Sequence, residues 1–145
     1  MKIPFSPPDI SDSEITAVIQ TLQSGWITTG PKVKEFEQQI ANFVDADWCV
    51  CLNSQTACAE MVLRVLGIGP GDEVITSAYT YTATAAVIHH VGAKIILIDT
   101  QENSLEMDYE ALKNAITEKT KAIIPVDIAG VPCDYDRIFK IVQEK

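Results

Sequence analysis

Residues 52–57 are the first stretch of the sequence that could do chemistry, and they read Leu-Asn-Ser-Gln-Thr-Ala. They follow a short apolar run and open a segment with helical periodicity. Small hydroxyl and amide residues at such a turn leave backbone N–H groups free at a helix N-terminus, an arrangement that binds phosphate. Simple capping of the helix by Asn53 or Ser54 is the commoner use of these residue types. The pattern alone leaves both interpretations open.

Residues 77–82, Ser-Ala-Tyr-Thr-Tyr-Thr, are a second candidate because they follow the apolar run that ends at Thr76. A tyrosine there could stack on the flat ring of a cofactor, although packing in the core is the commoner fate of an aromatic side chain. Ligands of open parallel sheets lie beyond the carboxyl ends of the strands. The two stretches would therefore place a phosphate cradle and a flat platform at one edge of a sheet.

Other polar residues give weaker signals. Asp99 and Asp127 each end an expected strand, where either could face a site or serve in a cap or turn. Cys49 and Cys51 would point to one face of a strand, but a zinc site needs three or four ligands. The sequence therefore predicts neither a metal site nor a disulfide framework, and we expect free thiols.

The elements that would position these residues alternate between strands and helices. Ser11 and Glu14 have the spacing of a capping box, and Pro31 suits the first position of a second helix. The expected strands are residues 48–52, 73–76, 94–98 and 120–126, and the later helices are 56–66, 82–91, one from Asp108 and one from Asp134. This order predicts an α/β fold with a mostly parallel sheet and helices on both faces. We expect residues 1–45 to form a helical arm and residues 46–145 an α/β domain.

Composition limits the classes of partner. The 145 residues include 11 basic and 20 acidic side chains, for a net charge of −9. Nucleic acids and anionic membranes favour clustered Lys and Arg, so neither is expected as the main partner. No apolar run approaches the roughly 18–20 residues of a membrane helix, and the N-terminus lacks a signal-peptide pattern. We therefore expect a cytoplasmic protein.

Six segments in a fixed order carry a family resemblance. They are residues 25–31 (GWITTGP), 53–57 (NSQTA), 67–75 (GIGPGDEVI), 83–85 (ATA), 91–93 (VGA) and 120–126 (TKAIIPV). Together they resemble the DegT family of sugar aminotransferases, which use pyridoxal 5′-phosphate and have the fold of the aspartate aminotransferase superfamily (fold type I). Residues 25–31 are most similar to enzymes that aminate the 4-keto carbon of nucleotide-linked sugars.

The resemblance implies roles for several positions. Gln55 and Thr56 match the turn that binds the cofactor phosphate through a backbone N–H and a hydroxyl, and Tyr81 matches the aromatic residue that stacks on the pyridine ring. Residues 26–30 match a loop near the active-site mouth at the family's dimer interface, so a homodimer is implied. Asp127 stands where many members have histidine. The implied substrates are a keto nucleotide sugar and an amino acid, with glutamate as the expected donor.

Two groups central to this family's chemistry have no match in the chain. The Schiff-base lysine and the aspartate that pairs with the pyridine nitrogen lie further along the family's sequence than residue 145. We therefore assign no catalytic residue, and expect an N-terminal portion of such an enzyme that is inactive alone. A non-catalytic binding or assembly module with the same fold is the alternative. An unrelated α/β nucleotide-dependent enzyme is disfavoured because the glycine fingerprint of dinucleotide binding is missing.

Overall fold

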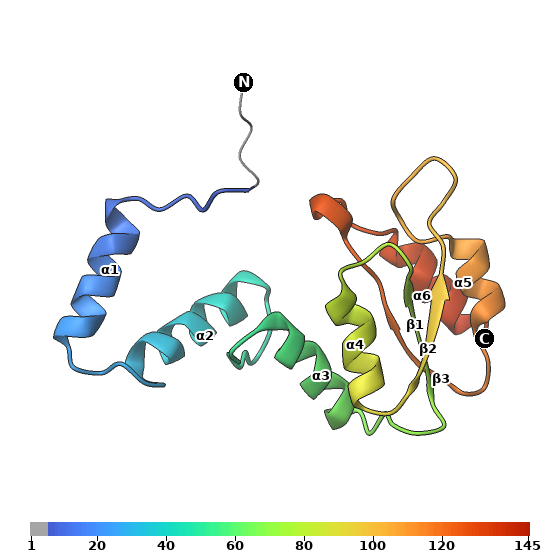
Figure 1. The fold of residues 1–145 in the computed structure, drawn as a ribbon, viewed down its shortest axis with the longest axis horizontal. Coiled ribbons are helices and arrows are strands. Elements are labelled where there is room, and N and C mark those ends of the chain that lie inside the picture. The colour runs from blue at the N-terminus through green and yellow to red at the C-terminus, as the bar shows by residue number, and fades with distance from the viewer. Residues whose placement is uncertain (1–5) are drawn as a thin grey trace. The chain divides into compact units, whose positions relative to one another are not determined.

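A computed structural model describes residues 6–145 of the chain (Figure 1). Its internal contacts divide it into two compact units, Met1–Cys51 and Leu52–Lys145. Within the described residues, no helix is long and apolar enough to cross a membrane. The two units are described separately below.

The first unit contains two helices whose starts follow from local sequence. Helix α1 (Asp12–Gln23) has Ser11 as its N-cap, and the Glu14 carboxylate accepts a hydrogen bond of 2.6 Å from the Ser11 backbone N–H. This reciprocal capping box satisfies two backbone donors that a helix start leaves unpaired. Helix α2 (Pro31–Phe43) begins with proline at its first turn, where the missing N–H costs nothing. Both expected helix starts are confirmed.

Residues 48–52 do not form the strand expected from their apolar sequence. The side chain of Trp48 is 88% exposed and that of Val50 is 72% exposed, whereas Cys49 and Cys51 are half-buried. The Cys51 backbone N–H donates to the Glu37 carboxylate at 2.8 Å. A strand is defined by a backbone partner as well as by its residues, and none of the described segments pairs with this one. The prediction of a buried strand was therefore wrong.

The second unit is built on a parallel sheet of three strands in the order β2-β1-β3. The strands are β1 (Glu73–Ser77), β2 (Lys94–Ile98) and β3 (Thr120–Ile124). The helices of this unit are α3 (Gln55–Val65), α4 (Thr82–His90), α5 (Tyr109–Ala115) and α6 (Tyr135–Gln143), and a short 3-10 turn, η1, spans Ile128–Gly130. Each helix and strand expected after residue 52 is present, with ends shifted by up to two residues.

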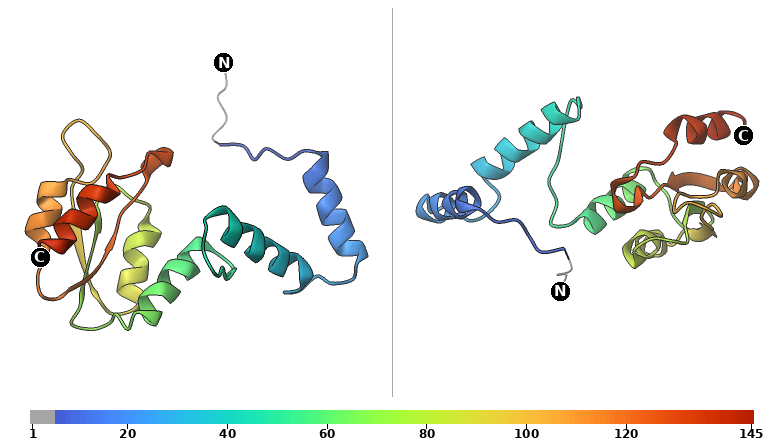
Figure 2. Two further views of the ribbon diagram at one scale, coloured as in Figure 1. Left: turned by 180° about the vertical axis from the view of Figure 1, so that it is seen from behind. Right: turned by 90° about the horizontal axis from the view of Figure 1, so that it is seen from above.

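Helices cover both faces of the sheet, and the central strand β1 is buried on both sides. Val74 faces the core shared with α3 and α4, which includes Leu63 and Ile88. Ile75 faces the core shared with α5 and α6, and Figure 2 shows α6 and α4 on opposite sides of the sheet. Alternate residues of a strand point to opposite faces, so a strand buried along its whole length, as β1 is, lies in a sheet covered on both faces. The predicted α/β class with a parallel sheet is confirmed.

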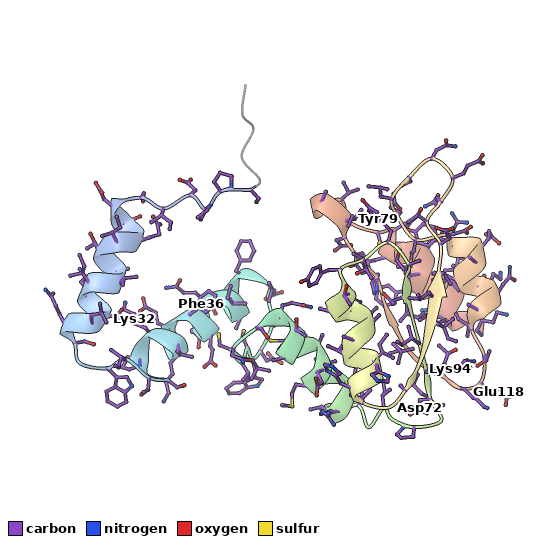
Figure 3. All side chains as sticks on the ribbon, viewed as in Figure 1. Lys32, Phe36, Asp72, Tyr79, Lys94 and Glu118 are labelled. Atoms are coloured by element: carbon purple, nitrogen blue, oxygen red, sulfur yellow. The ribbon has the colours of Figure 1, made fainter. Side chains whose placement is uncertain are left out.

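One buried carboxylate connects the strands at the amino end of the sheet. Glu73 is 7% exposed, and its carboxylate accepts hydrogen bonds from Lys94 Nζ at 2.8 Å and Thr117 Oγ1 at 2.7 Å. These two contacts hold the pKa of Glu73 below its usual value. Glu73 thereby joins the start of β1 to the start of β2 and to the turn before β3. Figure 3 shows Lys94 and Glu118 at this end and Tyr79 at the opposite end.

Candidate functional site at the carboxyl end of the sheet

The N-termini of two helices lie at the carboxyl end of the sheet. Helices α3 and α4 pack side by side (Figure 1). The Glu60 carboxylate, in the middle of α3, bonds Arg64 of the same helix at 2.7 Å and His90 Nδ1, at the end of α4, at 2.8 Å. Figure 1 shows the C-terminal ends of both helices toward the amino end of the sheet, so the two helices run in roughly the same direction. Because α4 starts just after β1 ends, the N-terminus of α3 also points toward that end, and both helix dipoles favour an anion there.

The start of α3 combines a capping residue with open backbone donors. Ser54 is the N-cap, and its Oγ accepts a hydrogen bond of 3.1 Å from the Ala57 backbone N–H. Capping, one of the two interpretations of this turn, is thus confirmed for Ser54. No described side chain accepts from the backbone N–H groups of Gln55 or Thr56, the first two residues of the helix. Capping and anion binding therefore use different donors, and one does not exclude the other.

The turn after β1 presents an exposed aromatic ring. Tyr81 is the N-cap residue of α4, with no side-chain hydrogen bond to the helix start, and its side chain is 82% exposed. It is therefore not a packed core aromatic. Ser77 Oγ accepts from the Tyr79 backbone N–H at 3.2 Å, and Thr80 Oγ1 and Thr84 Oγ1 lie 2.8 Å apart. These contacts brace the turn while the Tyr81 ring remains free to meet a ligand.

Asp127 organises the chain beyond β3, at the same end of the sheet. One of its carboxylate oxygens, Oδ1, accepts from the Cys133 backbone N–H at 2.9 Å and from the Tyr135 hydroxyl at 3.1 Å. The Tyr135 hydroxyl also lies 3.0 Å from Oδ2. The Cys133 backbone bond is the main cause that holds the pKa of Asp127 below its usual value, with a smaller contribution from Tyr135.

Sequence reasoning placed Asp127 at a strand end but did not connect it to Tyr135. The sequence does contain an indication that these two residues could meet, because they flank a loop that contains Gly130 and Pro132. Both of these residues favour a chain that turns back on itself. Asp99, the other strand-end aspartate, uses its carboxylate to accept from the backbone N–H of its neighbour Thr100. This carboxylate contact is local, and Asp99 meets the start of α5 only through its backbone carbonyl, which accepts from the Asp108 N–H at 2.9 Å.

Other parts of the described chain offer little for a ligand site. A groove of about 480 Å³ lies between β3 and α6, toward the amino end of the strand and away from Tyr81. Among residues 6–145, no group of three or more His, Cys, Asp or Glu side chains could hold a metal ion. None of the four cysteines forms a disulfide in the described structure. The chemically promising groups are those at the carboxyl end of the sheet.

The second unit is therefore an α/β unit with an open parallel sheet, and it carries two helix N-termini and an exposed aromatic ring at one sheet edge. In proteins with such sheets, ligands bind beyond the carboxyl ends of the strands. The sequence profile of the DegT/DnrJ/EryC1/StrS aminotransferase family matches residues 8–145. The chain therefore belongs to this family, and the resemblance described above is confirmed.

Curated relatives are similar over almost the whole chain. Spore coat polysaccharide biosynthesis protein SpsC of Bacillus subtilis is 46% identical over 141 residues, which are 97% of this chain and 36% of the relative. The UDP-4-amino-4-deoxy-L-arabinose–oxoglutarate aminotransferase of Shewanella sediminis is 45% identical over 139 residues, with 96% and 36% covered. The chain thus spans about a third of the length of these relatives.

Solved structures give the same fold. The PMP form of the putative sugar aminotransferase Spr1654 from Streptococcus pneumoniae aligns with a TM-score of 0.95 and 58% identity, over 99% of this chain and 36% of that one. Its PLP form aligns with a TM-score of 0.95 at the same identity, over 99% and 37%. The fold is that of the N-terminal part of the large domain of sugar aminotransferases of fold type I.

Proposed function

We propose that the carboxyl end of the sheet is part of a site for pyridoxal 5′-phosphate. The observations that carry the proposal are the open backbone donors at the start of α3 and the exposed ring of Tyr81 at the start of α4, a helix that packs against α3. The backbone N–H groups of Gln55 and Thr56, with the Thr56 hydroxyl, would hold the phosphate. Tyr81 would stack on the pyridine ring. The open donors and the exposed ring fit a phosphate and a flat ring.

The reaction proposed for the complete protein is transfer of an amino group from an amino acid, with glutamate as the expected donor, to a keto nucleotide sugar. Family membership supports this class of reaction, and the name of the Shewanella relative supports a nucleotide-linked 4-keto sugar. The cofactor, when bound, supplies an electron-withdrawing ring that stabilises charge on the substrate carbon. In this chain, Tyr81 would orient that ring, while the α3 N-terminus would anchor its phosphate.

We propose also that the 145 residues alone do not transaminate. The reaction needs a lysine amine to move a proton at the substrate carbon. In the described part of the second unit, the turns after β1 and β3 contain no lysine. Lys94 lies at the amino end of the sheet, paired with Glu73, and Lys113 pairs with Glu144. Turnover of a keto sugar with glutamate by the purified chain would contradict this proposal.

We propose further a helical arm, a homodimer and a cytoplasmic location for the complete protein. Residues 1–45 would form a helical arm, and the loop at residues 26–30 would lie at the interface of a homodimer. A cytoplasmic location suits four cysteines that form no disulfide, because disulfides are rare in reducing compartments. A non-catalytic assembly module is the second candidate, favoured by the many exposed apolar side chains of α1, among them Val18 and Leu22.

Binding of pyridoxamine 5′-phosphate to the 145-residue chain tests the cofactor proposal. This probe carries the ring and the phosphate but lacks the aldehyde that reacts with surface lysines. Titration followed by ligand fluorescence should show binding to the unaltered chain. Tyr81→Ala should weaken it by about two- to tenfold, the range expected for loss of one stacked ring. Phe139→Ala removes another exposed aromatic ring, on α6, and should leave the affinity unchanged.

Comparison of two ligands separates phosphate binding from ring binding. Pyridoxamine without the phosphate should bind much more weakly, because it offers nothing to the α3 N-terminus. Equal affinity for the two ligands would show that the chain has no phosphate site. A chain that binds neither ligand but forms a stable dimer would support the assembly module instead.

A further inference from the structure

The loop between β3 and α6 is apolar at its tip and polar at its base. Residues 128–132 read Ile-Ala-Gly-Val-Pro, and the Val131 side chain is 54% exposed. Ala129 has a φ of 52° and Gly130 a φ of 79°, so two successive residues adopt the left-handed conformation that bends the chain sharply. Alanine rarely adopts it, so contacts elsewhere in the loop must hold this shape.

The polar base of the loop is a clasp made by Asp127. Its Oδ1 accepts from both the Cys133 backbone N–H and the Tyr135 hydroxyl, residues that lie on the far side of the loop. The backbone adds two tight turns, because Gly130 N–H donates to the Asp127 carbonyl at 3.1 Å and Val131 N–H to the Ile128 carbonyl at 3.0 Å. One carboxylate thus ties the start of the loop to its end.

The loop stands beside the turn that carries Tyr81. Strand β3 pairs with β1 in parallel, with Thr76 opposite Ile124, and the Thr76 hydroxyl donates to the Ile124 carbonyl at 2.8 Å. Neighbouring parallel strands end at the same edge, so the segments that follow them emerge together. Figure 1 shows η1 and the start of α4 at this end of the sheet.

We propose that Asp127 is a positioning residue, whose carboxylate holds residues 128–132 as an apolar rim of the cofactor site at the carboxyl end of the sheet. This inference rests on the proposed function, since the rim has a use only if a ligand binds there. The described partners of the Asp127 carboxylate, the Cys133 backbone N–H and the Tyr135 hydroxyl, both belong to the chain beyond the loop. Asp127 acts through the shape that it gives to Ala129 and its neighbours.

Amide hydrogen exchange measured by NMR on the 145-residue chain tests the clasp directly. In Asp127→Ala, exchange of the amides of residues 129–131 and of Cys133 should accelerate by about tenfold or more, because hydrogen bonds to a charged acceptor are lost. Asp127→Asn keeps an oxygen at the Oδ1 position, where both donors meet, and should restore most of the protection. Asp99→Ala removes another carboxylate at this sheet edge and should leave the loop unchanged.

Titration of the same four proteins with pyridoxamine 5′-phosphate tests the rim. Asp127→Ala should weaken binding by about three- to tenfold, while Asp127→Asn and Asp99→Ala should stay within about twofold of the unaltered chain. Tyr135→Phe removes one of the two donors without touching the strand, and should give an intermediate effect on both exchange and binding. This variant keeps the test valid if Asp127→Ala fails to fold.

The outcomes separate this inference from the proposed function. Unchanged exchange in Asp127→Ala and Tyr135→Phe would overturn the positioning role, even where the ligand binds well. Faster exchange with unchanged ligand affinity would overturn the rim. Absence of binding by the unaltered chain would overturn the cofactor proposal and the rim together, whatever the exchange data show about the clasp.

Discussion

Glu73 is the residue whose charge contributes most visibly to the fold. Its carboxylate is buried at the start of the central strand and bonds Lys94 on one neighbour and Thr117 before the other. A buried carboxylate without partners would be costly, so these two contacts are what allow it to stay ionised. The lowered pKa of Glu73 reflects this stabilisation of its ionised form. Protonation of Glu73 at low pH should therefore lower the free energy of unfolding.

The stability of the second unit should fall with pH below the ordinary pKa of a glutamate, 4.5. A folded-state pKa below the unfolded value adds stability that is present above 4.5 and is lost as pH falls through the folded-state pKa. Glu73→Gln should therefore lose less stability than the unaltered chain between about pH 7 and about pH 3. Urea unfolding at the two pH values measures the difference.

The control for this prediction is Glu102→Gln, on the exposed loop that follows β2. It should keep the full acid sensitivity of the unaltered chain. If Glu73→Gln and the unaltered chain lose the same stability on acidification, then Glu73 is not the group that is responsible.

At the scale of elements, β1 is the centre of the second unit. Val74 and Ile75 are both fully buried and face opposite cores. The strands on either side are less covered, and Leu97 in β2 is 55% exposed. A truncation at Ile75 should therefore leave a cavity in the core shared with α5 and α6. A truncation at Val74 should leave one in the core shared with α3 and α4.

Truncation in the central strand should cost far more than truncation in its neighbour. Ile75→Ala is expected to lower the free energy of unfolding by about 2–5 kcal/mol, since it removes buried methylene groups and leaves a cavity. Leu97→Ala, at a largely exposed position, should cost less than about 1 kcal/mol. Chemical denaturation of the two variants gives both values. Similar losses in the two would mean that β1 is not the core of the unit.

The cap of α3 is a second element with a measurable contribution. Ser54→Ala removes the acceptor for the Ala57 backbone N–H and should cost about 0.5–2 kcal/mol, whereas Ser54→Asp keeps an acceptor and should cost little. Faster hydrogen exchange of the Ala57 amide in Ser54→Ala would locate the loss at the helix start. An unchanged Ala57 amide would show that the cap bond is not formed in solution.

At the scale of the whole molecule, the sheet has two open edges, since β2 and β3 each pair only with β1 among the described strands. The groove beside β3 is lined in part by Phe139 and Val142 of α6, which are 61% and 48% exposed. Open strand edges invite pairing with another chain, and apolar side chains beside such an edge strengthen the contact.

We expect the isolated chain to self-associate through the β3 edge. Sedimentation at concentrations on the order of 100 µM should show oligomers. Phe139→Glu should shift them toward monomer, because it places a charge in the groove. Met61→Glu, at a position on α3 that is 48% exposed, is the matched control and should not. A chain that stays strictly monomeric at high concentration would contradict this expectation.

The sequence allowed accurate prediction wherever a local rule decided the structure. The capping box at Ser11 and the proline at the start of α2 each specify the start of a helix without help from distant residues. Residues 48–52 failed because strand formation needs a partner that the sequence alone does not supply. The Asp127 clasp was missed for a related reason: Gly130 and Pro132 indicate a turn, but they do not indicate which residues beyond it donate to the carboxylate. The cofactor roles of Gln55, Thr56 and Tyr81 remain predictions.

The strand order has a consequence for how the unit is made. The central strand β1 precedes both of its neighbours in the chain, so it leaves the ribosome first. Strand β2 can then add to one side as soon as it emerges, and β3 to the other side, without any earlier pairing having to break. Domains commonly fold during synthesis in this N-to-C direction. The arrangement thus lets the sheet grow outward from its middle at the pace of translation.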